Sequence, residues 1–438
     1  MRGVRLSRWS MTYFTVAVTS LLLAEALWAS GLPTPLRDIG QPWVLAGVHL
    51  TTIGFLTLLM MGALHQFVPV LTETELASQS WSGVTVLTIT TGLLGMVLGF
   101  LALPGGPLPS APWLLPTGGT LVVIGVIVAL VNLGITLKRA WPWALPAWLA
   151  ATGLLYLLLT VLVGLLLALS LAVPGLFSTH QLYVMGGRGL ASHVIVGVGG
   201  WLTLTAMGVS YKLLAMFTLS DEHRGVWGWT AYLATAVGIF VAWLSRWMDW
   251  NRVADVAWIV ILVGLAIYLF DMRALYRVRK RRELELNARY GIVPLGFLAA
   301  LIVAGLVVRL GGELARIDIA LVYFALYGWL GGLALTQLYK IIPFLTWLNQ
   351  FGNKMGKGRV PRVQELVNEP RDRYAYLFYF LMVLVAAVSL AAGWFEGFRI
   401  AEALIFVATL DIARALYHAA HPKHEASPSK APEPSRAR

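Results

Sequence analysis

Three stretches of the chain repeat one pattern: GFLTLLMMGALHQFVP at residues 54–69, GWLTLTAMGVSYKLLA at residues 200–215 and GWLGGLALTQLYKIIP at residues 328–343. In every copy an aromatic ring follows the first glycine after eleven residues, and in the first and third copies a proline follows it after fifteen. The second copy has Ala215 at the proline position. Self-similarity of this kind predicts a fold built by repetition. The copies are 146 and 128 residues apart, which leaves room for four membrane spans per repeat.

The composition is that of an integral membrane protein. Hydrophobic residues make up 58% of the chain and charged residues 12%, with a mean hydropathy of +0.75, far from the values of soluble domains. Apolar runs of about 20 residues or more can cross a bilayer. Such runs are found at residues 9–30, 43–71, 83–104, 117–137, 148–172, 189–217, 227–247, 255–274, 291–309, 318–346, 375–393 and 400–418.

These runs predict an all-α integral membrane fold of twelve transmembrane helices. The helices form three four-helix repeats with pseudo-threefold symmetry, at about residues 9–140, 148–275 and 291–418. The repeated pattern falls on the second, sixth and tenth helices, which are also the longest and are expected to tilt. The lipid bilayer is therefore the first expected partner.

Positive charge collects on one side of this layout, at residues 2–8, 138–139, 277–282 and 354–373. Short cytoplasmic loops are enriched in Lys and Arg, so both termini are expected in the cytoplasm, in a multi-pass protein of the cell's inner membrane. This bias accounts for the net charge of +12. The high isoelectric point therefore gives no argument for a nucleic-acid partner.

The chain contains no cysteine, which excludes disulfides, iron–sulfur clusters and thiolate metal sites. The first apolar run is long and lacks a small-residue cleavage site, so it is expected to be retained as a span. A single membrane domain is expected at residues 1–420, followed by a disordered cytoplasmic tail at residues 421–438, which is rich in Pro, Ser and Ala. His418, His421 and His424 have helical spacing, and we interpret them as a solvated cluster rather than a metal site.

Two histidines lie inside apolar runs, where polar groups are costly and often functional. His49 precedes Gly54 by five residues, and His193 precedes Gly200 by seven. Positions two residues apart on a helix point to nearly opposite sides and differ by about 3 Å in depth. If the three equivalent helices surround three pores, two neighbouring helices aim one histidine each into the same pore. We therefore hypothesise a bis-histidine site; the alternative is that each histidine only hydrogen-bonds within the bundle.

At this point the chain resembles the catalytic-subunit superfamily of haem-copper oxidases, over about residues 9–418. The resemblance rests on helix count, the threefold repeat, the cytoplasmic N-terminus and the two histidines. In that family the second-helix histidine binds low-spin haem and a sixth-helix histidine binds copper, at positions matching His49 and His193. The tenth and seventh helices carry further histidine ligands in the family, but residues 318–346 and 226–232 contain no histidine here. The binuclear oxygen-reducing centre is therefore not expected, and copper is not expected either.

The family also implies how the two histidines could act together. Its low-spin haem lies between a tenth-helix histidine and the second-helix histidine of the next arc, and this arrangement rotated by one repeat pairs His49 with His193. The rotated arrangement implies one haem b. The chain also resembles oxidase-like membrane proteins of the nitric-oxide-response type, through its topology and its few histidines. Haem propionates need cations near the aqueous edge, although interfacial snorkelling is the alternative role for any arginine there. The candidate cations are Arg188, Arg37, Arg246 and Arg316.

The remaining polar residues have simpler interpretations. His65 aligns with Tyr211 and Tyr339, and we expect these rings to anchor the helices at the cytoplasmic interface. His180 is expected in an external loop and His223 in a charged cytoplasmic loop.

Three acids lie nearest the apolar zone. Glu25 and Glu402 fall near the outer ends of the first and twelfth helices, and Asp411 can pair with Arg414 at helical spacing. The sequence shows no other obvious proton path.

Three classes of function are compatible with these features. The favoured one is a haem-binding membrane protein for electron transfer or for response to a small gas or redox ligand, served by a redox partner or an additional subunit. The second is a nitric oxide or oxygen reductase with a non-standard site, which a partner subunit could complete. The third is a cofactor-free transporter or assembly subunit; four spans per repeat make the repeats parallel, whereas inverted repeats would favour a transporter.

Overall fold

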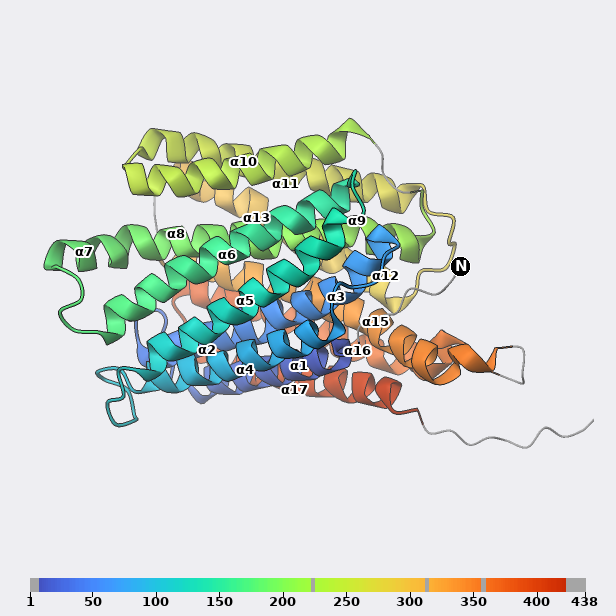
Figure 1. Ribbon diagram of the computed structural model, residues 1–438, viewed down its shortest axis with the longest axis horizontal. Helices are drawn as coiled ribbons and strands as arrows, with labels where there is room; N and C mark the ends of the chain where they lie inside the picture. The colour runs from blue at the N-terminus through green and yellow to red at the C-terminus, as the bar shows by residue number, and fades with distance from the viewer. Residues whose placement is uncertain (1–7, 222–224, 312–314, 356–359, 423–438) are drawn as a thin grey trace, which may run out of the picture.

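The computed structural model describes residues 8–221, 225–311, 315–355 and 360–422, and these residues form a bundle of helices without a strand (Figure 1). The expectations for His223, His424 and the tail beyond residue 422 lie outside the described residues. His418 and His421 are exposed at the end of the last helix, where both rings contact Tyr417.

Twelve long helices follow one another along the chain, several of them made of more than one element. In order they are α1 (Ser10–Ser30); α2 (Pro42–His49), η1 (Leu50–Thr57) and α3 (Leu58–Thr72); α4 (Gln79–Leu101); α5 (Leu114–Lys138); α6 (Leu145–Ala172); α7 (Thr179–Val184), η2 (Met185–Gly189), α8 (Leu190–Val194), η3 (Ile195–Thr203) and α9 (Leu204–Thr218); α10 (Val226–Met248); α11 (Asn251–Arg277); α12 (Leu286–Tyr290) and α13 (Ile292–Gly311); α14 (Ala315–Tyr323), η4 (Phe324–Gly331) and α15 (Gly332–Phe351); α16 (Glu369–Ala392); and α17 (Phe395–Ala420). Two short turns, η5 (Gly352–Lys354) and η6 (Val363–Leu366), precede α16.

Eleven of these helices are long and apolar enough to cross a membrane. The exception is α17, which carries Glu396, Arg399, Glu402, Asp411 and Arg414. The protein is thus a multi-pass integral membrane protein whose outward-facing side chains contact the lipid bilayer.

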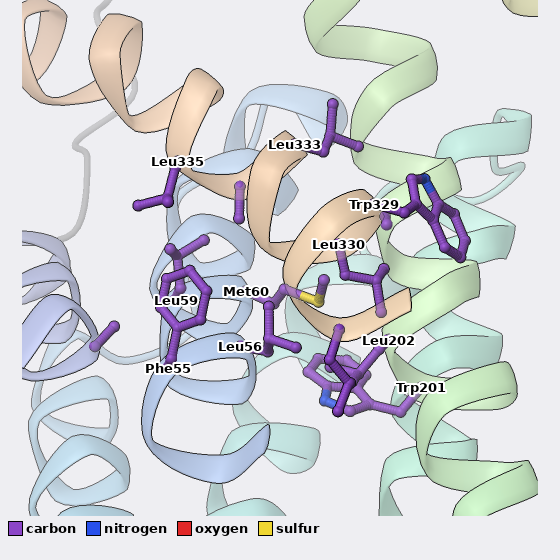
Figure 2. Packing of buried hydrophobic residues seen from close by; sticks show 14 of the residues in the cluster. Phe55, Leu56, Leu59, Met60, Trp201, Leu202, Trp329, Leu330, Leu333 and Leu335 are labelled. Atoms are coloured by element: carbon purple, nitrogen blue, oxygen red, sulfur yellow. The ribbon is translucent and has the colours of Figure 1, made fainter. Parts of the chain in front are cut away.

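The three helices that carry the repeated pattern form the centre of the bundle. In their most apolar windows, 67%, 72% and 78% of the residues are buried, compared with 22–50% in the other eight spans. Figure 2 shows Leu56, Leu202 and Leu330 from the three helices directed toward one another. The indole nitrogen of Trp201 donates a hydrogen bond of 2.9 Å to the Thr57 hydroxyl, which ties the sixth helix to the second.

Each copy of the pattern begins inside a π-helical segment. These segments are η1, η3 and η4, and the first helix of each repeat packs against one of them: α1 against η1, α6 against η3 and α13 against η4. π-helical turns are rare and occur often at functional sites. The repetition in sequence therefore corresponds to a repetition in local structure.

The glycine that opens the pattern allows the close approach of that first helix. A Cβ atom at Gly54 would lie 2.6 Å from Cβ of Ser20, and one at Gly200 would lie 2.5 Å from the ring of Tyr156. In the third copy the nearest neighbouring helix atom is 3.0 Å away, on Phe297. Both shorter distances are below van der Waals contact, so a larger residue would push the helices apart.

The contacts among the outer helices recur from repeat to repeat. The third and fourth helices of each repeat pack as a pair: α4 with α5, α10 with α11, and α16 with α17. The next contacts join one repeat to the following one, α5 with α6, α11 with α13, and α17 with α1. The ring of helices is closed, and α1 begins and α17 ends at the same end of the bundle (Figure 1).

The sixth helix begins earlier than the sequence predicts. It starts at Thr179 rather than residue 189, because Ser178 and Gln181 form a reciprocal capping box at its N-terminus. The loop assignment of His180 is therefore wrong: this residue is exposed on α7, which extends beyond the neighbouring helices (Figure 1).

Candidate functional site: a pair of facing histidines

The structure brings His49 and His193 together. Their ring centres are 6.4 Å apart and their ring planes differ by 25°. His49 is the last residue of α2 and directly precedes η1, whereas His193 lies in α8, one residue further from the start of η3.

Backbone carbonyls hold both imidazoles in one tautomer. Nδ1 of His49 lies 2.8 Å from the Leu45 carbonyl oxygen, and Nδ1 of His193 lies 3.0 Å from that of Thr160. A carbonyl only accepts, so each Nδ1 carries the proton and each Nε2 keeps its lone pair. Within the described chain neither Nε2 has a hydrogen-bond partner. Metal-ligating histidines are typically held through the other ring nitrogen in this way.

An aromatic ring lies beside His49, and a glycine lies beside His193. The Phe100 ring lies 4.7 Å from that of His49, centre to centre. On α6, a Cβ at Gly164 would lie 2.9 Å from Cε1 of His193, so the absence of a side chain there makes room for the imidazole. Both histidines are only half-buried although they lie on the two central helices. The pair is therefore not enclosed by packed side chains.

The donor set suits one metal that brings further ligands of its own. Two imidazoles that share a metal through Nε2, with bonds of about 2.0–2.1 Å and about 1.1 Å from nitrogen to ring centre, have centres about 6 Å apart. The described residues contain no group of three or more His, Asp or Glu side chains arranged to hold an ion. A bare divalent ion on two imidazoles is under-coordinated, whereas haem supplies four equatorial nitrogens and needs two axial ligands.

Two of the four predicted arginines, Arg188 on η2 and Arg246 on α10, lie where these two elements meet. Arg188 forms an ion pair of 2.9 Å with Asp249 and donates to the Trp247 carbonyl at 3.4 Å. The Trp247 indole in turn donates to Ser192, next to His193, at 2.8 Å. Arg246 is half-buried on α10, and its buried Nε has no hydrogen-bond partner.

The other two arginines lie elsewhere. Arg37 is exposed in the connection between α1 and α2. Arg316 is exposed on α14, with its guanidinium against the backbone at Gly393. Of the four arginines, Arg188 is the one linked to the neighbourhood of His193, through Trp247 and Ser192.

The expected interfacial anchors lie inside the bundle instead. His65, Tyr211 and Tyr339 are all buried. The two tyrosines donate to carboxylates, Tyr211 to Asp271 at 3.0 Å and Tyr339 to Asp372 at 2.6 Å. The interfacial interpretation is wrong because polar partners on neighbouring helices, which the aromatic-plus-lysine pattern does not reveal, satisfy these hydroxyls within the protein.

His65 has a similar buried setting without a carboxylate. Its ring stacks on Tyr13 with centres 5.4 Å apart, and its Nδ1 bonds the Met61 carbonyl at 2.7 Å. It lies on α3, toward the other end of the second helix from His49.

The acids are placed in two different ways. Asp411 pairs with Arg414 at 3.0 Å, as the sequence predicts, and also with Arg371 at 3.3 Å. Glu25 and Glu402, which the sequence places near the ends of two different helices, are both fully buried where α1 packs on α17, close enough to influence each other electrostatically. The signal that could have found them is the closure of a helical ring, which brings the first and last helices into contact.

No family model matches this chain, and no curated protein is significantly similar to it.

Proposed function

We propose that this protein is a haem-binding integral membrane protein of haem-copper oxidase-like fold. It acts in electron transfer or in the response to a small gas or redox ligand, and it lacks a binuclear oxygen-reducing centre. One observation carries the proposal: two imidazoles 6.4 Å apart, each held through Nδ1 by a backbone carbonyl, with both Nε2 lone pairs unused.

In this proposal His49 and His193 would hold one haem b through their Nε2 atoms. Haem held in this way supplies one-electron redox chemistry of its iron. The Leu45 and Thr160 carbonyls orient the ligands and increase the basicity of the imidazoles. Arg188 and Arg246 are the preferred partners for the propionates. Two protein ligands favour electron transfer, and gas binding would require one histidine to leave.

The proposal includes a pseudo-threefold arrangement of the three repeats in the cell's inner membrane, with both termini in the cytoplasm. The recurring contacts of α5 with α6, α11 with α13 and α17 with α1 support the symmetry. The basic connections at residues 138–139 and 277–282 support the orientation. An electron carrier also needs a redox partner or an additional subunit.

The test is the visible spectrum of the purified protein, oxidised and dithionite-reduced, with iron analysis of the same sample. We expect sharp reduced α and β bands and one iron per chain. His49→Ala and His193→Ala should each remove most of the bound haem. His180→Ala is the matched control, because His180 is exposed on the same long helix as His193 and should leave the spectrum unchanged.

Retention of full haem content in both alanine variants would contradict shared ligation. A wild-type protein without a Soret band, after expression with ample haem, would contradict the proposal altogether and favour the cofactor-free transporter or assembly role.

A further inference from the structure

A second polar cluster lies where the first and last helices meet, away from the histidine pair. Glu25 on α1 and Glu402 on α17 are 0% exposed. Tyr323 and Tyr327, from α14 and η4, face the same place and are also buried. Two carboxyl groups are thus enclosed inside the membrane domain.

Most of the carboxyl oxygens lack a partner. Thr409 donates to Oε1 of Glu25 at 2.8 Å. Oε2 of Glu25 and both carboxyl oxygens of Glu402 are buried without a hydrogen bond. The Tyr323 hydroxyl approaches Glu402 but makes no hydrogen bond of normal geometry. Orphaned acceptors of this kind are costly in an apolar interior.

No described cation neutralises the pair. Neither carboxyl forms an ion pair, and no described Lys, Arg or His side chain lies against them. The other titratable groups that face the pair come from three elements packed around it, and all of them are phenols: Tyr323, Tyr327 and Tyr379. Two ionised carboxylates within electrostatic reach of each other in this apolar setting would repel each other and lose their hydration, so one or both must bind a positive charge.

We propose that Glu25 and Glu402 form a proton-binding site in which the two carboxyls together hold at least one exchangeable proton at neutral pH. A proton fits better than a metal ion, because hard cations require six or more oxygen ligands and the cluster also contains unpaired donors. The Tyr323 hydroxyl and the indole nitrogen of Trp28, one turn from Glu25, are buried without an acceptor. Unpaired donors and acceptors together are the setting that internal water molecules bridge, which gives the proton a way to exchange.

The site is connected to the helix that carries His49. The Tyr327 hydroxyl and the Thr51 hydroxyl are 2.9 Å apart, and Thr51 follows His49 by two residues. Tyr327, which lies within electrostatic reach of the carboxyl pair, is therefore joined to the second helix by one hydrogen bond.

The experiment is infrared spectroscopy of the purified protein at neutral pH in H₂O and D₂O. A protonated carboxyl absorbs apart from an ionised one, and its band shifts in D₂O when the proton exchanges. We expect such a band in the wild type, altered in Glu25→Gln and in Glu402→Gln, and absent from the double variant. Glu396→Gln is the matched control, because Glu396 is exposed on α17 and pairs with Arg399 at 3.1 Å. It should leave the band unchanged.

Three results would overturn the proposal: no protonated carboxyl in the wild type, a band insensitive to D₂O, or a band that survives in the double variant. Stoichiometric sodium, potassium or calcium in elemental analysis would replace the proton with a bound cation. If the variants fail to fold, wild-type protein labelled with ¹³C at the glutamate carboxyl decides the matter, because only a glutamate band then shifts.

Discussion

The helical turn before the π-helical segment carries different chemistry in the third copy of the repeat than in the first two. His49 in the first copy and Tyr323 in the third both lie five residues before the opening glycine, and each directly precedes a π-helical segment. His49 faces another imidazole with a free lone pair, whereas Tyr323 stacks on Tyr327 at 4.7 Å and faces Glu402. One scaffold position thus presents a metal-ligand type at one junction and a phenol beside carboxyls at another.

The difference shows that the repeat determines where a side chain points and the individual residue determines the chemistry. A pair of neutral imidazole nitrogen donors suits a redox metal, and a pair of acids without cations suits a proton. Variants can therefore change one site and leave the other intact, which makes the two proposals separable.

The largest effect is expected from Gly164→Val, which should change haem binding at the His49–His193 pair and leave the carboxyl pair intact. Its new side chain would occupy the space of the His193 ring, where even a Cβ comes within 2.9 Å of Cε1. Because the ring is the free end of a side chain, it should rotate away rather than unfold the bundle. We expect bound haem to fall more than tenfold, measured by the Soret band per chain, with the carboxyl infrared band unchanged.

Gly134→Val is the control for this substitution, because no atom lies within 4 Å of a Cβ at Gly134. Equal loss of haem in both variants would count against a specific role for the space at Gly164.

A smaller effect is expected at Glu285, a carboxylate that does have cations beside it. Burial would raise its pKa, but hydrogen bonds from Lys340 and Gln364, and the charges of Lys340 and Arg281, hold the pKa below its usual value of 4.5. The stabilisation of the fold by the ionised Glu285 is therefore present at neutral pH and is lost as the pH falls through the lowered pKa.

The variant Glu285→Gln should destabilise the protein by about 1.5–3 kcal/mol at pH 7, the range for hydrogen bonds to charged groups. Thermal unfolding in detergent measures this, and the gap from wild type should close in acid. A gap that stays constant between pH 7 and pH 3 would show that the carboxylate charge contributes nothing.

The hydrogen bond between Thr51 and Tyr327 is expected to contribute less still to the stability of the protein. Thr51→Val and Tyr327→Phe each remove one end of the 2.9 Å hydrogen bond between the second and tenth helices. A double-mutant cycle on thermal stability should give a coupling of about 0.6 kcal/mol, the average for such bonds within membranes. Additive effects would mean that the two junctions are not energetically connected there.

The smallest effect on stability is expected from Tyr323→Phe, because the hydroxyl makes no hydrogen bond of normal geometry. The carboxyl infrared band should change in frequency, since a neighbouring donor is removed, and haem content should stay at the wild-type level. A loss of haem in this variant would contradict the separation of the two junctions.

Much of this architecture follows from the sequence, because its determinants repeat. The glycine at 54, 200 and 328 predicts three equivalent helices, and hydropathy predicts their membrane environment. The offset between His49 and His193 indicates a shared junction, since residue spacing along a helix fixes direction. The π-helical segments could not be predicted, because α and π turns of a central membrane helix are built from the same apolar residue types.

Long-range closure is the part that local patterns cannot reveal. Thr409 and Glu25 are separated by 384 residues and meet only because α17 packs on α1. The same holds for Tyr211 with Asp271, where an aromatic near a helix end resembles a lipid-facing anchor until its partner helix is in place. Such contacts depend on the order of helices around the ring rather than on any single stretch.

The π-helical segments η1, η3 and η4 also set how far one half of each central helix is rotated relative to the other half. Each accommodates more residues per turn than an α-helix, so it sets the rotation between the two halves of a central helix that it joins. Deleting one residue from η3 would rotate everything beyond it by about 100° relative to the core, carrying His193 away from His49 while the apolar packing below stayed in register. An insertion in one central helix is thus a means of re-aiming a ligand by a fixed step, and a descendant of this scaffold could acquire or lose a metal site by changing its length by one residue.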